Sequence, residues 1–565
     1  MFFRKKNKKK YKDIYPDEIF ADSHNFPEFD TSQLEGRLEK PLGKKTVLFL
    51  GLFFALVSFV FIGRVWSLQI QKGELYAARG EQNTLKHSII FSKRGVIYDR
   101  NKIPLAWNEQ NENGDFALRK YTDLSGLSNL LGYIGYPLKD SAGFFYQEEI
   151  AGKEGVEKFF NENLAGRNGL KIYESDVLSN IISESVIKQP QDGEDIFLSV
   201  DSKIQNKLYR EIAELASKVG FKGGASVIMD IKTGEIIAMV SYPEFKSQIL
   251  TDLKDKKIIG NFLQDPNKPF LNRVAQGLYT PGSIVKPFIG IGALNSGVVT
   301  PDTKILSTGE IKIPNPYEPN SFSVFKDWKA HGLVNIKEAI AMSSNVYFYE
   351  VGGGYKNQRG IGIEGIESYA RAFGLGTATG IDWLDEADGV VPNPKWKEEN
   401  FEGDIWRLGD TYNTAIGQYG FQITPIQMAR AIAGIANYGI LATPSIILGE
   451  MGAFNKIPIE IKNEYFDIIK EGMRDSVLFG TSKGLNVSNF EVAAKTGTAE
   501  IGISKKYVNS WSIGFFPYKN PRFSFVTVME SGPGSNLMGS VFVMRNLFDW
   551  MIVNAPEYVF KDGIK

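Results

Sequence analysis

The sequence contains no cysteine and only three histidines among its 565 residues. The absence of cysteine excludes disulfide bonds, cysteine nucleophiles and cysteine-ligated metals. A hydrolase of the Ser-His-Asp type would need one of these three histidines. His24 lies in an N-terminal tail, His87 in a connecting region, and His331 in a turn before a helical stretch, where we expect a structural role. The shortage of histidine therefore favours a lysine as the base for any serine chemistry.

The chain also has no excess charge of either sign, because 65 basic residues balance 65 acidic ones. This balance predicts no nucleic-acid partner. Hydrophobic residues make up 43% of the chain and 57 residues are glycine, which is typical of a globular, loop-rich protein with room for two or three domains. We expect no metal and no other cofactor.

One long uncharged run, residues 46–63 (TVLFLGLFFALVSFVFIG), comes after a tail with a basic start. At 1.5 Å per residue, this run would span roughly 27 Å as a helix, close to the thickness of a bilayer core. We predict a disordered cytoplasmic tail over 1–45 and a single transmembrane helix over 46–66. Lys44 and Lys45 place the N-terminus in the cytoplasm by the positive-inside tendency, so that the remainder would be extracytoplasmic at the cell membrane.

A change in the pattern of apolar and polar residues divides the chain beyond residue 66 into a smaller domain, 67–195, and a larger one, 196–560. The larger domain begins with a helical pattern and a predicted hairpin over 225–241, continues through helices and loops, and returns to strand-like sequence near its end. These late strands are expected at 492–498, 511–516 and 523–529, before a last helix near 541–553. Strands at both ends of a helical middle indicate an α+β domain whose sheet is built from distant segments.

A serine and a lysine lie three residues apart in the stretch Leu278–Phe288. Pro281 and Gly282 predict a turn that opens a helix, which would place Ser283 in its first turn and Lys286 on the same face. A neutral lysine one turn away could remove the hydroxyl proton and make Ser283 a nucleophile. The bare tetrad is common, since it recurs at Ser185 and Ser323.

Two polar clusters downstream strengthen this interpretation. Ser343 and Asn345 lie near the edge of a predicted helix, and Lys495-Thr496-Gly497-Thr498 lies on a predicted strand. The cation, hydroxyls and free backbone N–H groups of such a strand could receive a substrate carboxylate and stabilise an oxyanion. Gly497 would also allow a ligand to approach the backbone closely. Lys232-Thr233-Gly234 repeats the triplet at a hairpin turn, where it is better explained by turn chemistry.

The ordered series Ser-x-x-Lys, Ser-x-Asn and Lys-Thr-Gly is the signature of penicillin-binding proteins and serine β-lactamases. The chain resembles a class B penicillin-binding protein, and within that family 379–396 and 409–418 look more like the elongation-type enzyme, penicillin-binding protein 2, than the septal one. The stretches that carry the resemblance are RGVIYDRN (94–101), VIMDIKTGEIIAMVSYPEF (227–245), NRVAQGLYTPGSIVKPF (272–288), SSNVYFYEVG (343–352), IGQYGFQITPIQMARAIAGIANYG (416–439) and AAKTGTAE (493–500).

The resemblance implies a role for each motif residue. Ser283 would be acylated by a stem peptide ending in D-Ala-D-Ala, with Lys286 as the base. Ser343 and Asn345 would relay protons and hold the peptide, while Lys495 would contribute positive charge. In the remaining triplet, Thr496 and Thr498 would bind the carboxylate beside Gly497, and the backbone N–H groups of Ser283 and Thr498 would form the oxyanion hole. We also expect Lys495 to lower the pKa of Lys286.

The same resemblance implies an architecture and partners. The fold would be α+β, with a small irregular pedestal (dimerisation-like) domain over 67–195 and a transpeptidase domain over 196–560 that has an antiparallel sheet flanked by helices. The pedestal looks trimmed over 109–139. Stem peptides would be the substrates, β-lactams the inhibitors, and a polytopic glycan polymerase in the membrane a partner. The function would be crosslinking of the cell wall, in elongation and shape rather than septation.

Other functions share parts of this pattern. A carboxypeptidase passes the acyl group to water and a β-lactamase hydrolyses a lactam, and no motif in the sequence separates these acceptors from an amine. A non-catalytic receptor for wall peptides would need an output module, but the cytoplasmic part has only about 45 residues and no domain-like pattern. The anchor and the pedestal favour transpeptidation by resemblance.

Overall fold

The computed structural model describes residues 43–74, 85–112, 114–141, 145–175, 181–315, 318–488, 490–502, 506–536 and 538–560. The predicted cytoplasmic tail therefore lies almost wholly outside the described residues. The chain divides into two compact units, one made of 1–86 with 173–183 and the other of 87–172 with 184–565. The second unit contains every candidate site residue.

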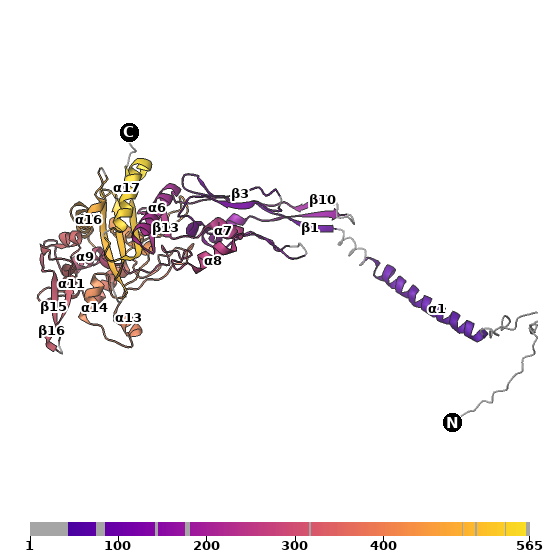
Figure 1. Ribbon diagram of the computed structural model, residues 1–565, viewed down its shortest axis with the longest axis horizontal. Helices are drawn as coiled ribbons and strands as arrows, with labels where there is room; N and C mark the ends of the chain where they lie inside the picture. The colour runs from indigo at the N-terminus through magenta and orange to yellow at the C-terminus, as the bar shows by residue number, and fades with distance from the viewer. Residues whose placement is uncertain are drawn as a thin grey trace, which may run out of the picture. The chain divides into compact units, whose positions relative to one another are not determined.

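The N-terminal unit contains a long apolar helix. Helix α1 (Lys44–Trp66) continues into a short π-helical turn, η4 (Ser67–Gln71), as Figure 1 shows for α1. Over the described residues, Val47–Gln71 is the one helical stretch with the length and apolar composition needed to cross a membrane. Its side chains are uncovered, and Phe59 is 80% exposed. The sequence prediction of a long apolar helix here is confirmed.

The first part of the second unit is built from short strands and helices. Its elements are β2 (Ile97–Tyr98), β3 (Pro104–Glu109), β4 (Leu118–Tyr121), α3 (Ser128–Leu131), β5 (Ile134–Gly135), β6 (Leu138–Lys139), β7 (Phe145–Gln147), β8 (Ala151–Gly152), α4 (Gly155–Phe159), α5 (Asn161–Ala165) and β11 (Ile196–Phe197). Three further strands, β1 (Leu85–Ile90), β9 (Gly169–Ser175) and β10 (Ile181–Lys188), have residues in both units. β11 closes a four-stranded sheet of order β11-β2-β3-β4. The buried carboxylate of Glu157 pairs with Arg94 at 2.5 Å and with Arg119 at 2.8 Å, which ties these segments together.

A five-stranded sheet forms the centre of the larger domain. Its order is β13-β12-β22-β21-β20, and every neighbouring pair is antiparallel. The strands are β12 (Gly223–Asp230), β13 (Ile236–Tyr242), β20 (Ala493–Ile501), β21 (Tyr507–Phe516) and β22 (Phe523–Pro533). The predicted hairpin and late strands are therefore confirmed, and the N-terminal hairpin joins the C-terminal strands through β12 and β22. This pairing leaves β20 as an edge strand.

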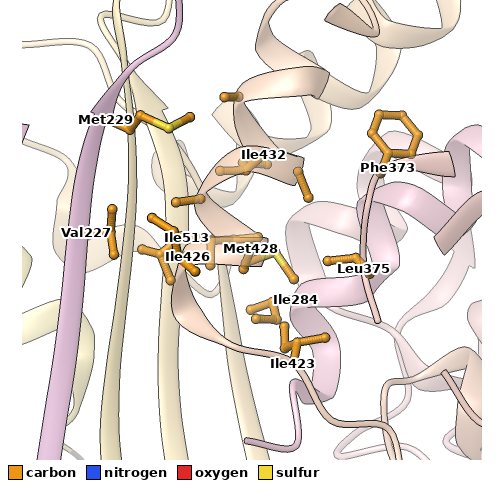
Figure 2. Packing of buried hydrophobic residues seen from close by; sticks show 14 of the residues in the cluster. Val227, Met229, Ile284, Phe373, Leu375, Ile423, Ile426, Met428, Ile432 and Ile513 are labelled. Atoms are coloured by element: carbon orange, nitrogen blue, oxygen red, sulfur yellow. The ribbon is translucent and has the colours of Figure 1, made fainter. Parts of the chain in front are cut away.

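Helices cover both faces of this sheet. Alternating residues of β12 point to opposite sides, so Val227 joins one hydrophobic core and Ile228 the other. Helices α6 (Ser202–Val219) and α17 (Ser540–Asn554) contribute to the core around Ile228. Helices α9 (Lys286–Asn295) and α15 (Pro425–Ala436) contribute to the core around Val227, and Figure 2 shows Ile284 packed there beside Ile423. The segment that holds Ser283 is thus anchored in the main core.

The helical middle contains more strand than the sequence predicts. A hairpin of β15 (Glu310–Asn315) and β16 (Glu318–Lys326) lies where the sequence predicts helix and loop. The other elements are α7 (Ser247–Asp252), α8 (Lys256–Gln264), β14 (Ile305–Ser307), β17 (Gly332–Val334), α10 (Ile336–Met342), α11 (Asn345–Gly353), α12 (Gly362–Ala372), α13 (Pro394–Asn400), α14 (Leu408–Ala415), β18 (Ile440–Ala442), β19 (Phe454–Lys456), α16 (Asn463–Leu478), η6 (Lys483–Leu485) and α18 (Pro556–Val559). The hairpin packs Phe325 against Tyr349 and Tyr412, and this long-range contact leaves no local signal in the sequence.

Candidate active site

The nucleophile candidate lies in a tight turn before a buried helix. Residues Gly282–Val285 form a 3₁₀ turn, η5, and α9 begins at Lys286. In a 3₁₀ turn the side chains at i and i+3 eclipse each other, so Ser283 and Lys286 share a face as predicted, although the predicted first helical turn is 3₁₀ rather than α. Ser283 is partly exposed, whereas Lys286 is fully buried. Within the described part of the chain, the Ser283 hydroxyl has no hydrogen-bond partner and is free to meet a ligand.

Lys286 is held by the second cluster. Its Nζ donates to the backbone oxygen of Ser343 at 2.8 Å and to Asn345 Oδ1 at 2.7 Å, and it lies 3.4 Å from Ser343 Oγ. The ring of Phe348 lies 5.4 Å away. The amine therefore faces the predicted proton-relay group and is shielded from water.

The Ser343 cluster is a break between two helices. Ser343 ends α10 in the left-handed region, with φ of 58°, and Ser344 caps the N-terminus of α11 by accepting a hydrogen bond from Tyr347 N. This break turns the Ser343 hydroxyl toward the third cluster. Lys495 Nζ donates to Ser343 Oγ at 2.8 Å, so one hydroxyl lies between two buried lysines.

The third cluster lies on the edge strand β20. Thr498 is exposed, while Thr496 is half-buried and donates to Thr481 Oγ1 at 2.7 Å. Alternate N–H groups of an edge strand point away from its single neighbour and are available to a ligand. The structure thus brings all eight predicted site residues together at the β20 edge of the sheet, beside η5. They are Ser283, Lys286, Ser343, Asn345, Lys495, Thr496, Gly497 and Thr498.

The edge strand and the nucleophile turn meet at glycines. A Cβ on Gly497 would lie 2.8 Å from Pro281 O and 2.9 Å from Ile284 Cγ2, and one on Gly282 would lie 3.0 Å from Thr498 O. A Cβ on Gly417 would lie 2.2 Å from Gly282 O. Gly497 therefore allows close approach of the protein's own turn, which differs from the sequence expectation of close approach by a ligand.

Replacing Gly497 with alanine is expected to push β20 away from η5, because the new Cβ would meet a backbone oxygen. A displacement near 1 Å at reacting groups costs about 100-fold in rate. We expect acylation of Ser283 by a labelled penicillin to slow by about 10- to 100-fold, measured by stopped labelling and gel fluorescence. Gly260→Ala is the control, since a Cβ there meets nothing within 4 Å. An unchanged rate in Gly497→Ala would show that this contact does not set the site geometry.

Burial dominates the electrostatics of the two lysines. Loss of solvent lowers the pKa of Lys286 from 10.5 to about 7, against a smaller opposing effect of Asp327. Burial, followed by the charge of Lys286, lowers the pKa of Lys495 well below its ordinary value. The expectation that Lys495 lowers the pKa of Lys286 is wrong about the cause, because desolvation is the dominant influence on both amines.

Asp327 is a functional candidate that the sequence analysis did not find. Its buried Oδ2 accepts from Ser344 Oγ at 2.8 Å and from Val346 N at 3.0 Å, which fixes the start of α11. The His331 side chain is 1% exposed and its Nε2 lies 3.6 Å from Asp327 Oδ1. His331 therefore lies close to the site, and neither of its buried ring nitrogens has a hydrogen-bond partner among the described residues. The structural role expected for it stays a prediction. Across the described residues, no three histidine or carboxylate side chains gather as a metal site.

Comparison with known families matches two parts of the chain. Residues 224–547 match the penicillin binding protein transpeptidase domain, and residues 115–198 match the penicillin-binding protein dimerisation domain. The chain is 32% identical to peptidoglycan D,D-transpeptidase MrdA of Acinetobacter baumannii over 459 residues, which cover 76% of this chain and 65% of that enzyme. It is 27% identical to MrdA of Escherichia coli, with 90% of this chain and 93% of that enzyme covered.

Solved structures agree with these sequence matches. A complex between penicillin-binding protein PBP2 and MreC from Helicobacter pylori has a TM-score of 0.68 at 27% identity, and covers 83% of this chain and 99% of that one. A second structure is described as "Structural coordination of polymerization and crosslinking by a peptidoglycan synthase complex". It has a TM-score of 0.69 at 26% identity, and the match covers 90% of this chain and 98% of that one.

Proposed function

The chain belongs to the penicillin-binding protein transpeptidase family, and from this premise we propose that it is a peptidoglycan D,D-transpeptidase that uses Ser283 as its nucleophile in cell elongation. The observation that carries this proposal is the single constellation of Ser283, Lys286, Ser343 and Lys495, assembled from a turn, a helix break and an edge strand. The alignment spans 65% of the Acinetobacter relative and 93% of the Escherichia relative.

The first half-reaction is acylation. Ser283 Oγ attacks the carbonyl carbon of the penultimate D-Ala of a stem peptide while neutral Lys286 accepts the hydroxyl proton. A pKa near 7 makes an amine that is neutral often enough to take a proton and acidic enough to return it. The backbone N–H groups of Ser283 and Thr498 stabilise the tetrahedral oxyanion. The peptide C–N bond then breaks, and the proton passes by way of Ser343 Oγ to the amine of the departing D-Ala.

The terminal carboxylate of the substrate binds to the edge strand. Thr498 donates a hydroxyl hydrogen bond to it, and Thr496 does the same once its hydroxyl turns away from Thr481 Oγ1. Asn345 holds the peptide beside them. Burial and the charge of Lys286 both favour neutral Lys495. An incoming carboxylate favours the charged form of a neighbouring amine, so substrate binding itself would protonate Lys495. The positive charge of Lys495 would thus form beside the bound carboxylate.

The second half-reaction transfers the acyl group to an amine of a neighbouring strand. Lys286 takes a proton from the attacking amine, the new amide forms, and the ester oxygen of Ser283 receives that proton as it leaves. The peptidoglycan strands that this enzyme would crosslink lie outside the cytoplasm. We therefore place the N-terminus in the cytoplasm, and the pedestal at 67–195 and the transpeptidase domain at 196–560 outside. A polytopic glycan polymerase that supplies nascent strands is the partner that this arrangement suits, in keeping with the synthase complex described for a structural neighbour.

Reaction with a fluorescent penicillin tests the proposal directly. The full-length protein in detergent is expected to form a stable, stoichiometric adduct, and Ser283→Ala is expected to form none. The loss should exceed about 10⁴-fold, because the nucleophile itself is removed. The thermal unfolding midpoint of the variant serves as the folding control. Labelling that persists in Ser283→Ala would move the nucleophile elsewhere, and rapid turnover of the drug by the wild type would identify a β-lactamase instead.

A further inference from the structure

The segment that carries Ser283, residues 278–286, is held from two sides. On one side, Tyr279 exchanges two backbone hydrogen bonds with Ile423, at 3.0 and 3.1 Å. On the other side lies the central sheet. Among the described residues, no hydrogen bond joins 280–285 to 495–498, so the nucleophile turn meets the edge strand β20 through packing without a directional bond. Two hydrogen bonds from other strands of the sheet reach the segment instead.

Trp511 of β21 supplies the shorter of these two bonds. Its indole Nε1 donates to the backbone oxygen of Thr280 at 3.0 Å, and its fully buried ring meets the ring of Tyr279 edge to face, with 6.0 Å between the centroids. The other bond is a long one, from Tyr279 Oη to Glu530 Oε2 at 3.4 Å. A donor prefers to lie near the plane of the carbonyl that it meets. The indole therefore holds the Thr280–Pro281 peptide in one orientation.

The place of Trp511 on its strand explains how the indole reaches the turn. Trp511 is paired with Gly497 of β20, and residues directly opposite one another on adjacent strands point to the same face of the sheet. Because Gly497 has no Cβ, Pro281 and Ile284 of the turn occupy the space beside it. The pair thus works together, since the glycine lets the turn approach β20 and the tryptophan holds it there by a hydrogen bond.

The orientation of this peptide matters for the chemistry of the site. Pro281 has a fixed φ, so the direction of the Thr280 carbonyl determines how the chain enters η5. Ser283 lies in the first turn of η5, where backbone N–H groups have no partner within the helix. Its N–H and that of Thr498 have to converge on one oxygen to within about 2.7–3.1 Å if they are to stabilise an oxyanion.

We propose that Trp511 is a positioning residue for the oxyanion hole, an inference that rests on the proposed function. Its indole N–H holds the Thr280 carbonyl and thereby fixes the turn against β20. The N–H groups of Ser283 and Thr498 then meet at the carbonyl oxygen of the substrate. The indole is fully buried, so it acts on the substrate only through Thr280.

Two replacements of Trp511 in the full-length protein in detergent separate the N–H from the ring. Trp511→Phe removes the N–H and part of the ring. Amber suppression introduces 3-benzothienylalanine instead, which keeps the bicyclic shape and puts sulfur in place of the N–H. We expect both variants to form the penicillin adduct about 10- to 100-fold more slowly, because a shift near 1 Å at reacting groups costs about 100-fold. The pH midpoint of the rate should stay near 7, since the indole bonds to Thr280 and not to Lys286.

Infrared difference spectra of the penicillin adduct give a readout that a loss of stability alone would not move. Hydrogen bonds from the oxyanion hole lower the stretching frequency of the ester carbonyl formed on Ser283, which is observed with penicillin that carries ¹³C at its β-lactam carbonyl. This band should move to higher wavenumber and broaden in both variants. The benzothienyl variant should unfold at the wild-type temperature. Trp550→Phe, on α17, is the control and should leave the rate and the band unchanged.

A benzothienyl variant with the wild-type rate and the wild-type band would overturn the proposal, because the N–H would then be dispensable. A slowed variant whose band stays in place would do the same, since its defect would lie outside the oxyanion hole. A wild-type protein that forms no adduct on Ser283 would overturn the proposed function and this proposal together. Normal wild-type labelling with unaffected Trp511 variants would overturn this proposal alone.

Discussion

Replacing Lys286 with methionine is expected to slow acylation of Ser283 by about 10³-fold, because a positioned general base contributes about 10²–10⁴-fold and this one is the proposed acceptor of the hydroxyl proton. In the wild type, the acylation rate should rise about tenfold per pH unit in acid and level off above a midpoint near 7, where Lys286 becomes neutral. The measurement is the second-order rate of labelling by fluorescent penicillin between pH 5.5 and 9. The small residual rate of Lys286→Met should lack this midpoint.

The stability of the folded protein offers an independent check on the same pKa. The pKa of Lys286 is about 7 when folded and near 10.5 when unfolded, so between these values the unfolded state binds more protons. Stability linked to Lys286 should therefore rise with pH across this window. This contribution should be missing in Lys286→Met, so its stability should rise less steeply with pH, through Lys495 alone. Thermal unfolding at several pH values measures the difference. A wild-type rate midpoint above pH 9, or parallel stability curves for the two proteins, would contradict a neutral Lys286.

The local features of the site follow from short stretches of sequence. Pro281 and Gly282 predict the turn before Ser283, and three-residue spacing predicts that Lys286 shares its face. A serine that can cap a helix, Ser344, marks the break that carries the second cluster. The strand of Lys495 is recognisable from its apolar neighbours. Order and spacing along the chain are enough to separate these clusters from their repeats elsewhere.

Features that depend on packing between distant segments could not be predicted. Gly497 looks like a residue that admits a ligand, but its missing Cβ makes room for Pro281, more than 200 residues away. The pKa of Lys286 is set by burial under Phe348 and its neighbours, whereas the sequence suggests repulsion by Lys495. The hairpin that ends before Asp327 has no clear period of its own, because its stabilising contacts come from α11 and α14. In each case the deciding contact is remote in sequence.

Asp327→Asn is expected to have the largest effect on stability. The carboxylate accepts from Ser344 Oγ, Val346 N and Trp328 N, and it is fully buried. Hydrogen bonds to a buried charge contribute about 1.5–3 kcal/mol each, and an asparagine keeps the shape but only one acceptor atom. We expect the free energy of unfolding in urea to fall by about 3 kcal/mol. Asp302→Asn, an exposed carboxylate, should change it by less than about 0.5 kcal/mol.

The same variant also tests how Asp327 acts on catalysis. Its negative charge raises the pKa of Lys286 against the effect of burial, so removing the charge should lower that pKa further. The midpoint of the acylation rate should then move below that of the wild type, while the rate on the plateau above pH 8 should fall only severalfold. A purely structural aspartate would lower the plateau and leave the midpoint where it was. A midpoint shifted below that of the wild type therefore shows that Asp327 acts on the pKa of Lys286, and an unshifted one confines Asp327 to holding the start of α11.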